Sequence, residues 1–347
     1  MANPSVRSLA DTCGLSTATV SRALAGHHGV RPETRALVAS AARRAGYRRN
    51  HLVGAVMSHI RVARVKKFHG SLALIHVPSP GQPGLLSTQQ KIISGARLRA
   101  AELGFKLDIF SLGEKGLSLR RLVHVLEARN VSGLIFIYAD PSTATADFPW
   151  EKFTSVAIDY GDREPRITTV CIDHYHTLMG ALGRLQGQGY RRIGLFLERF
   201  KDDRLWFRFS AAHHSFHVNT PRTAHLPPYV AERMEAEGFL AWYRKNKPDV
   251  IVGHIDEAIA WLRASGVRVP ETTAFFNLNW TARKRPCAGL NILPELQGSV
   301  AAETVIEQIH RHERGRPDHP RNIMIRGRWV DGPTLPPAPG QPATPRE

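Results

Sequence analysis

The hexapeptide TATVSR near the N-terminus carries side chains that could read duplex DNA. Thr17 and Ala18 stand where the first residues of a recognition helix reach base edges in the major groove, and Arg22 follows one turn later. An arginine can pair with both O6 and N7 of guanine, which discriminates against a wrong base by about 1–3 kcal/mol. The hydroxyls of Thr19 and Ser21 suit phosphates, which fix the register without reading sequence. The chemistry predicted for this segment is therefore DNA recognition.

Such side chains need a rigid support, and the surrounding pattern predicts one. Residues 6–14 predict a short helix that Gly14 stops, and Ser16 is a good N-cap for a second helix over 17–25. Two short helices around a glycine-containing turn form a helix-turn-helix pattern. A third helix is predicted over 32–45, with a proline in its first turn. The alternative from pattern alone is a three-helix bundle without any role in DNA binding.

The charge distribution favours the DNA-binding interpretation. The chain has 347 residues and a formal net charge of +17. Residues 1–70 hold twelve Lys and Arg against two acidic residues, so the excess is concentrated in the first fifth of the chain. A strongly basic segment ahead of a milder body is typical of a polyanion-binding unit. A solvated basic face would have the same composition.

The run SLADTCGLSTATVSRALAG, followed by VRPETRALVASAARRAGYRRN, resembles the N-terminal domain of LacI-type transcriptional regulators. The similarity is unbroken from Val6 to Asn50, and it implies a helix-turn-helix domain over 1–49. It also implies a homodimer whose two recognition helices enter successive major grooves of a pseudo-palindromic operator. In the family the segment after the asparagine is a hinge helix, so the resemblance adds Asn50 to the DNA-binding residues.

Residues 50–70 correspond to this hinge and a basic linker, and they depart from the family pattern. The family inserts a leucine into the minor groove at the operator centre, and Val56 stands at that position here. Apolar wedges of this kind unstack a base step and kink the duplex. Gly54 replaces a better helix former. Val56 is the predicted wedge, with Met57 and Leu52 as alternatives; a plain connecting helix is the other interpretation.

The body of the chain alternates strands and helices, which predicts parallel sheets with helices on both faces. Strands are predicted at 72–78, 106–112, 131–139, 153–160, 167–173, 191–198, 249–254, 272–279, 289–294 and 323–330. Helices are predicted at 88–103, 117–128, 174–188, 203–217, 230–246, 255–264 and 296–312. The fold class expected is an all-α helix-turn-helix domain followed by a two-lobed α/β core.

The core over 71–332 resembles the family's effector-binding and dimerisation core, which is like the periplasmic sugar-binding proteins. The matching segments are 95–105, 131–135 and 189–194. The resemblance implies one lobe of about 71–160 plus about 290–315, and a second of about 165–288 plus about 320–331. Residues 333–347 are rich in proline and predict a disordered tail.

The family grips a sugar-like effector between the lobes with an arginine in an R-x-x-G motif. Arg208 matches that arginine, although alanine replaces the glycine, and a surface arginine on a basic helix is an equal interpretation. Its planar fork could hold two hydroxyls or a carboxylate. Further candidates for the same site are Asp159, Trp206, Phe276, Asn277 and Trp280. The family's acidic residue near 277–280 is missing, so loss of effector sensing stays open.

Other classes of function find no support in the sequence. Cys13, Cys171 and Cys287 are too far apart for a disulfide framework or a cysteine metal site. The clustered histidines of 213–217 lack further ligands, so no metal and no cofactor are expected. No stretch approaches the roughly 18 apolar residues of a membrane span, and no secretory signal or enzyme motif is present. We therefore expect a cytoplasmic repressor at the bacterial nucleoid, and not an enzyme. A solute-binding module with an incidental basic head is the alternative.

Overall fold

The computed structural model describes residues 6–24, 30–45, 69–78, 85–138, 147–159, 166–220 and 224–336. Of six residues within these ranges it describes the backbone only: Val6, Arg7, Ala18, Ser21, Lys115 and Tyr138. The chain divides into two compact units, Met1–Lys67 and Phe68–Glu347. Each unit is described by itself.

The N-terminal unit contains three helices, α1 (Val6–Cys13), α2 (Thr17–Leu24) and α3 (Pro32–Arg44). They share one small core, to which each helix contributes a fully buried aliphatic residue: Leu9, Val20 and Val38. Gly14 follows α1 with a left-handed backbone (φ +65°), and Leu15 N donates to Ala10 O at 3.0 Å. A glycine at this position ends a helix without the strain that a side chain would bring. The predicted helix-turn-helix domain is confirmed.

The first lobe of the core is built on a six-stranded sheet in the order β11-β5-β4-β3-β1-β2, with every pair parallel. Its strands are β1 (Gly70–Val77), β2 (Phe105–Ser111), β3 (Val131–Tyr138), β4 (Thr154–Ile158), β5 (Thr168–Ile172) and β11 (Asn322–Ile325). Helices α5 (Ser87–Glu102) and α12 (Pro294–His310) bury one face, and α6 (Leu119–Ala128) with the segment 148–153 buries the other. Because both faces are covered, β4 and β5 are buried at every position.

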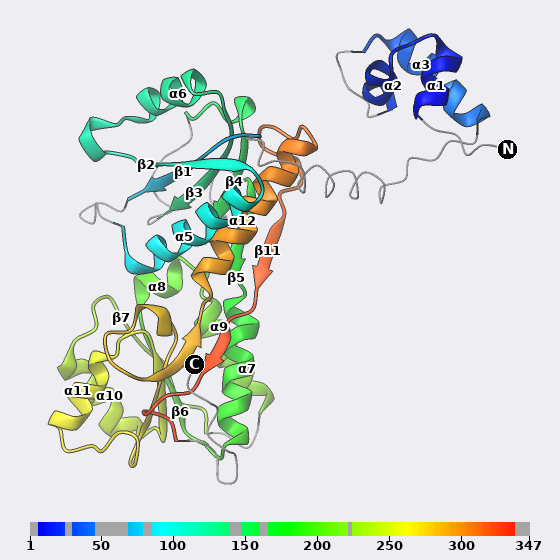
Figure 1. Cartoon of the computed structure of the whole chain (residues 1–347). Helices are drawn as coiled ribbons and strands as arrows, with labels where there is room; N and C mark the ends of the chain where they lie inside the picture. The colour runs from blue at the N-terminus through cyan, green and yellow to red at the C-terminus, as the bar shows by residue number, and fades with distance from the viewer. Residues whose placement is uncertain are drawn as a thin grey trace. The chain divides into compact units, whose positions relative to one another are not determined.

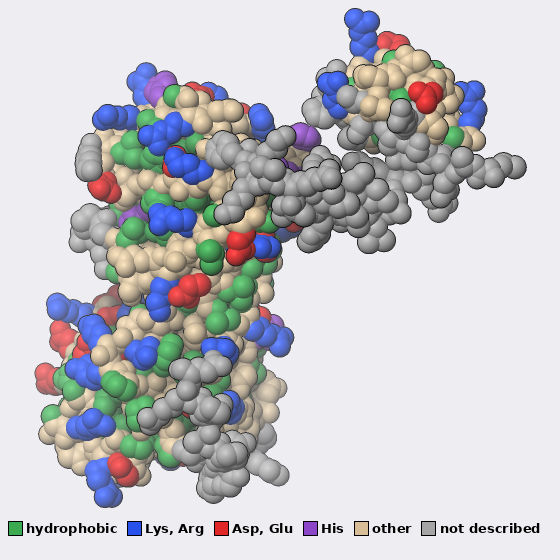
Figure 2. All heavy atoms as spheres, in the orientation of Figure 1, with side chains coloured by type: hydrophobic (Ala, Val, Ile, Leu, Met, Phe, Trp, Pro, Cys, Tyr) green, Lys and Arg blue, Asp and Glu red, His purple; other side chains and the backbone are tan. Residues whose placement is uncertain are grey.

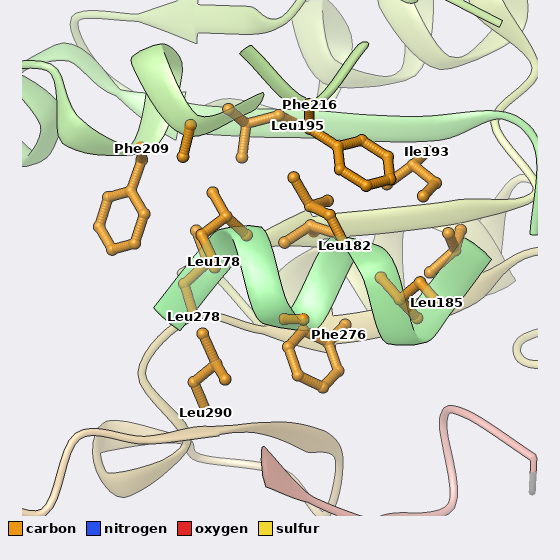
Figure 3. Close-up of a cluster of buried hydrophobic side chains, with 14 of the residues drawn as sticks. Leu178, Leu182, Leu185, Ile193, Leu195, Phe209, Phe216, Phe276, Leu278 and Leu290 are labelled. Carbon is orange, nitrogen blue, oxygen red and sulfur yellow. The ribbon is translucent and has the colours of Figure 1, made fainter. Parts of the chain in front are cut away.

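The second lobe has its own sheet in the order β12-β10-β9-β8-β6-β7. Its strands are β6 (Ile193–Glu198), β7 (Tyr229–Ala231), β8 (Val250–Gly253), β9 (Ala274–Asn277), β10 (Ala288–Asn291) and β12 (Arg328–Val330), which is antiparallel to β10. Helices α7 (His174–Gly187) and α9 (Arg208–Asn219) cover one face, and α10 (Ala236–Asn246) with α11 (Glu257–Ala264) covers the other. Figure 3 shows leucines of α7 interleaved with side chains of α9 and the sheet.

Helices α5 and α12 of the first lobe lie in backbone contact, which two glycines permit. A Cβ added to Gly95 would lie 1.9 Å from the carbonyl oxygen of Glu295, and one added to Gly298 would lie 1.9 Å from that of Ile92. In Figure 1 the two helices run side by side across the sheet. This junction fixes the C-terminal helix to the first lobe, although it is distant from that lobe in the sequence.

The chain crosses between the lobes at 172–174, 291–294 and 325–328 (Figure 1). The sequence analysis assigned β5 and β11 to the second lobe. Both strands instead lie in the first lobe, where they pair with each other in its sheet. The single strand predicted over 323–330 is two strands in different sheets. The predicted helix over 203–217 is interrupted at 204–207, and the N-terminal part of 230–246 is a strand. Among the described helices, none is long and apolar enough to cross a lipid bilayer.

Candidate nucleic-acid interface and core ligand site

Helix α2 is held by a cap at its N-terminus and by an inward residue. Ser16 caps its N-terminus, since its Oγ accepts from Thr19 N at 3.1 Å and lies 2.8 Å from Thr19 Oγ1. Val20 is fully buried and faces α1 and α3. Thr17 and Arg22 are exposed at either end of the helix. A capped helix with a buried inner face can present its first turn to a partner without fraying.

The other predicted DNA-binding residues have different outcomes. Thr19 is half-buried and its hydroxyl is engaged by Ser16, so it serves the cap. Ala18 and Ser21 belong to α2, and the structure describes only their backbone. Asn50 and Val56 lie outside the described residues, as does the whole predicted hinge.

Helix α3 adds positive charge to the same unit. Arg31 stands at its N-cap, Pro32 begins it, and Arg43 and Arg44 occupy its last turn. All three arginines are exposed. Cations in the last turn also interact favourably with the helix dipole. The unit thus offers exposed guanidinium groups on α3 as well as on α2, which suits contacts to several phosphates.

In the core, Arg208 is the first residue of α9, and two unusual residues precede it. Trp206 and Phe207 both have left-handed backbones (φ +55° and +56°) and are 48% and 52% exposed. The turn is held by buried Asp202 of α8 (Arg199–Asp203), whose carboxylate accepts from the Ser210 hydroxyl and, at 3.4 Å, from Ser210 N. Large residues seldom adopt this conformation, and such strain tends to be retained at functional sites.

Two histidines lie against the start of α9. The rings of His174 and His254 are 4.9 and 5.1 Å from the ring of Phe209, each in an edge-on contact. Burial is the main cause that lowers the pKa of His174 to about 3, with a further contribution from the charge of Arg208. The pKa of His254 is also well below its ordinary value, through burial and then the charges of Lys201, His174 and Arg204. Both rings are therefore neutral at physiological pH.

Asp159 follows β4 at the edge of the first lobe and forms an ion pair with Arg204 of the second lobe. It does not need a glycine at its left-handed backbone (φ +79°), because aspartate tolerates that region better than most residues. Asp159 therefore pairs with the turn before α9, which contains Arg204. The ion pair brings Asp159, Arg204 and the start of α9 into one site between the lobes.

The remaining candidates separate into core and site. Phe276 is fully buried in β9 and packs against Trp329, with ring centroids 4.3 Å apart, so the prediction that it lines a ligand site is corrected to a core role. Asn277 is also buried, and its Oδ1 accepts from Asn279 N at 2.7 Å, which shapes the turn after β9. Trp280 donates to Cys287 O at 3.0 Å and carries Arg283 over its ring.

The sequence analysis missed three residues of this site: His174, Arg204 and His254. A signal for both histidines was available, because His254 is the last residue of the predicted strand 249–254 and His174 directly follows the predicted strand 167–173. Ligands of open parallel sheets bind beyond the carboxyl ends of the strands. For Arg204 no such signal exists, since its position depends on the interruption between α8 and α9. Among the described residues, no group of three or more His, Cys, Asp or Glu side chains is placed to hold a metal ion.

Comparison with known proteins identifies the N-terminal unit. Residues 6–50 match the family model described as bacterial regulatory proteins, lacI family. A curated relative is the uncharacterized HTH-type transcriptional regulator YkvZ of Bacillus subtilis (strain 168), 27% identical over 214 residues. That alignment spans 61% of this chain and 60% of the relative's length.

Solved structures of similar fold extend over both units. The transcriptional regulator CelR in its cellobiose complex is 20% identical with a TM-score of 0.58, covering 96% of this chain and 100% of CelR. The lac repressor dimer bound to operator and the anti-inducer ONPF is 17% identical with a TM-score of 0.54, and the match covers 96% of this chain and 99% of the lac repressor chain. The regulator CcpA of Lactococcus lactis is 12% identical with a TM-score of 0.57, covering 77% and 99%.

These findings first define a class, the helix-turn-helix proteins that carry a two-lobed α/β core. Within that class, residues 6–50 of this chain match the lacI family of bacterial regulatory proteins. The relatives and structural neighbours described above are transcriptional regulators and not enzymes.

Proposed function

We propose that this protein is a transcriptional repressor of the LacI type, which binds a pseudo-palindromic operator as a homodimer. The observation that carries the proposal is the capped helix α2, which exposes Thr17 and Arg22 within a domain of the lacI family. In a helix-turn-helix protein the second helix enters the major groove, and a two-fold dimer reads two half-sites one helical turn apart. Such a protein acts where the chromosome lies, so we place it in the cytoplasm.

In this proposal the residues of the N-terminal unit have distinct tasks. Arg22, Thr17 and Ala18 contact base edges, whereas the exposed arginines of α3 contact phosphates. Ser21 and Thr19 remain candidates for phosphate contacts, with Thr19 acting mainly through the cap on α2. Asn50 and Val56 are assigned to the hinge that reaches the minor groove.

We also propose that the core binds a small, sugar-like effector at the junction of its two lobes. Support comes from Arg208 at the start of α9, from the exposed Trp206 in the turn before it, and from Asp159 of the first lobe, which pairs with Arg204 of the same turn. Asn277 is the last residue of β9 and Trp280 follows it, at the carboxyl edge of the second sheet. The cellobiose complex of CelR shows that a protein of this fold can hold a sugar. The effector would then change operator affinity by binding two arrangements of the lobes unequally.

Selection from a random duplex library tests the DNA-binding function. The selected duplex and a scrambled one are titrated at several salt concentrations with the wild type, Arg22→Ala and Arg44→Ala. We expect a pseudo-palindrome that the wild type binds roughly 10³-fold or more tightly than the scrambled duplex. Arg22→Ala should lose about 1–3 kcal/mol of the free energy that discriminates the base pair Arg22 contacts. Arg44→Ala should bind both duplexes more weakly by the same factor, and its affinity should depend less steeply on salt.

Equal binding of both duplexes by the wild type, fading steeply with salt, would leave only non-specific phosphate contacts. That result would contradict the operator-binding function and would favour ligand binding by the core as the function of the protein. Circular dichroism of each variant verifies that the helices of the N-terminal unit are retained.

A further inference from the structure

The ion pair between Asp159 and Arg204 joins the two lobes of the core across the candidate ligand site. Asp159 directly follows β4 of the first sheet, and its N–H donates to Val170 O at 2.9 Å. Arg204 directly follows α8 of the second lobe, and its Nη2 donates to the carboxylate of Asp159. The two side chains are 29% and 27% exposed, so water screens the pair only in part. The carboxylate of Asp159, from the first lobe, thus neutralises the guanidinium of Arg204, from the second lobe.

Arg204 lies near further basic side chains, and carboxylates beside them have partners of their own. At neutral pH the charges that act on His254 are those of Lys201 and Arg204, and both disfavour its protonated form. The charge of Arg208 likewise lowers the pKa of His174, whereas the charge of Asp173 raises it. Three carboxylates lie on the same stretch of chain: Asp202 accepts from Ser210 at the start of α9, Glu198 pairs with Lys201 at 2.7 Å, and Asp203 directly precedes Arg204.

A second observation points to a missing partner at this place. The Nδ1 atom of His254 is buried and has no hydrogen-bond partner among the described residues. His254 packs edge-on against Phe209, the residue after Arg208, so the atom belongs to the same site. A buried polar atom of this kind normally has a partner, which can be a bound molecule.

We propose that the ligand of the core carries a carboxylate or phosphate group, and that this anion replaces Asp159 on Arg204. The proposal rests on the proposed function of the lobe junction as the effector site. A guanidinium fork pairs with either group through two parallel hydrogen bonds. Ligand binding then exchanges an ion pair between the lobes for one between protein and ligand, and the contact of Asp159 with the second lobe is released. A neutral sugar would leave that contact in place.

The test uses the full-length protein with inorganic phosphate and, separately, acetate as probes at constant ionic strength. All six tryptophans lie between residues 150 and 329, so tryptophan fluorescence reports on the core and not on phosphate bound by the N-terminal unit. The proteins compared are the wild type, Asp159→Asn, Arg204→Gln, and Arg199→Gln as a matched control. Arg199 is a half-exposed arginine of the neighbouring α8 that pairs with Glu232. Asparagine tolerates the left-handed backbone at position 159, so Asp159→Asn removes only the charge.

We expect Asp159→Asn to bind phosphate or acetate roughly fivefold more tightly than the wild type, the effect of removing a competing pair worth about 1 kcal/mol. The probe that gains more identifies the ligand group as phosphate or carboxylate. Arg204→Gln should abolish the binding, and Arg199→Gln should bind like the wild type. The double variant Asp159→Asn/Arg204→Gln should also fail to bind, while retaining the unfolding transition of the core.

Equal affinity of the wild type and Asp159→Asn for both probes, or no binding by either, would overturn the proposal. So would unchanged binding by Arg204→Gln. The operator titration on the same preparations separates this failure from that of the proposed function. Operator discrimination without any anion response refutes the anionic ligand alone, whereas an anion response without operator discrimination refutes the repressor function.

Discussion

Acidification from pH 7.5 to pH 5 should destabilise the core through the buried pair His213 and His217 on α9. His213 is 1% exposed, and its Nε2 lies 3.2 Å from Ile193 O and 3.0 Å from Nε2 of His217. Because a carbonyl oxygen only accepts, the proton between the two rings is best assigned to His213 Nε2, which makes His217 the acceptor. A second proton on the pair would place two N–H groups against each other.

The sign of the pH effect follows from the direction of the pKa shift. Burial is the main cause that lowers the pKa of His213 to about 3, helped by the charges of His217, His225 and His214 and opposed by the hydrogen bond to Ile193. In the unfolded chain the same imidazole takes up its proton at about pH 6.5. The unfolded state therefore binds more protons below pH 6.5, so stability is complete above this pH and is lost as the pH falls toward 3. Between pH 7.5 and 5, one such group costs about 2 kcal/mol.

Urea unfolding followed by tryptophan fluorescence at the two pH values measures this loss in the wild type and in His213→Leu. We expect the free energy of unfolding of the wild type to fall by about 2 kcal/mol more than that of the variant. His214→Gln is the matched control, because His214 is exposed on the same helix, and its loss should equal that of the wild type. An equal fall in the wild type and His213→Leu would refute the argument that burial keeps His213 neutral.

Three further substitutions test the packing of each unit. Gly298→Ala should destabilise the core by about 3 kcal/mol or more in the same urea assay, since its Cβ would collide with the carbonyl of Ile92 and backbone cannot yield as a side chain can. Gly183→Ala, exposed inside α7 with open space at its Cβ, should instead raise stability by up to about 1 kcal/mol; a loss would contradict the helix-propensity argument. Leu9→Ala should destabilise the N-terminal unit by about 2–5 kcal/mol and weaken operator binding, while the tryptophan transition of the core stays unchanged. A shifted core transition in Leu9→Ala would show that the two units unfold together.

The N-terminal unit was predictable because its information is contiguous. For each helix the stop or cap and the buried positions lie within a few residues of one another, so local rules identify each helix to within one or two residues. The tertiary contacts then add little that the pattern lacks. What the sequence could not predict here is that Thr19 is used by the cap on α2, because a hydroxyl can serve a helix end or a phosphate equally well.

The two-lobed α/β class of the core was predictable from the sequence, but the lobe to which each strand belongs was not. Periodicity identifies a buried strand, yet it does not say which sheet receives it: β5 is buried at every position, as are β4 of the first lobe and β8 of the second. Its place is decided by pairing with β4 and β11, which lie far apart in the sequence. The same limit explains why Phe276 was predicted to line a ligand site. A phenylalanine suits a ligand wall and a core equally, and only its packing against Trp329 shows that it is a core residue.

The crossings and the ion pair together define how a ligand could act on this core. The lobes are connected by three short segments, so a change between them is most easily a rotation about these segments. A ligand can favour one arrangement only by the difference in its contacts with the two. On the face shown in Figure 2, Lys and Arg side chains of the core lie scattered over both lobes and do not form one large patch. The site at Asp159 and Arg204 is different, because it opposes charges from the two lobes and depends directly on their separation. An anion at Arg204 would therefore alter the one described ion pair whose partners move apart when the lobes rotate.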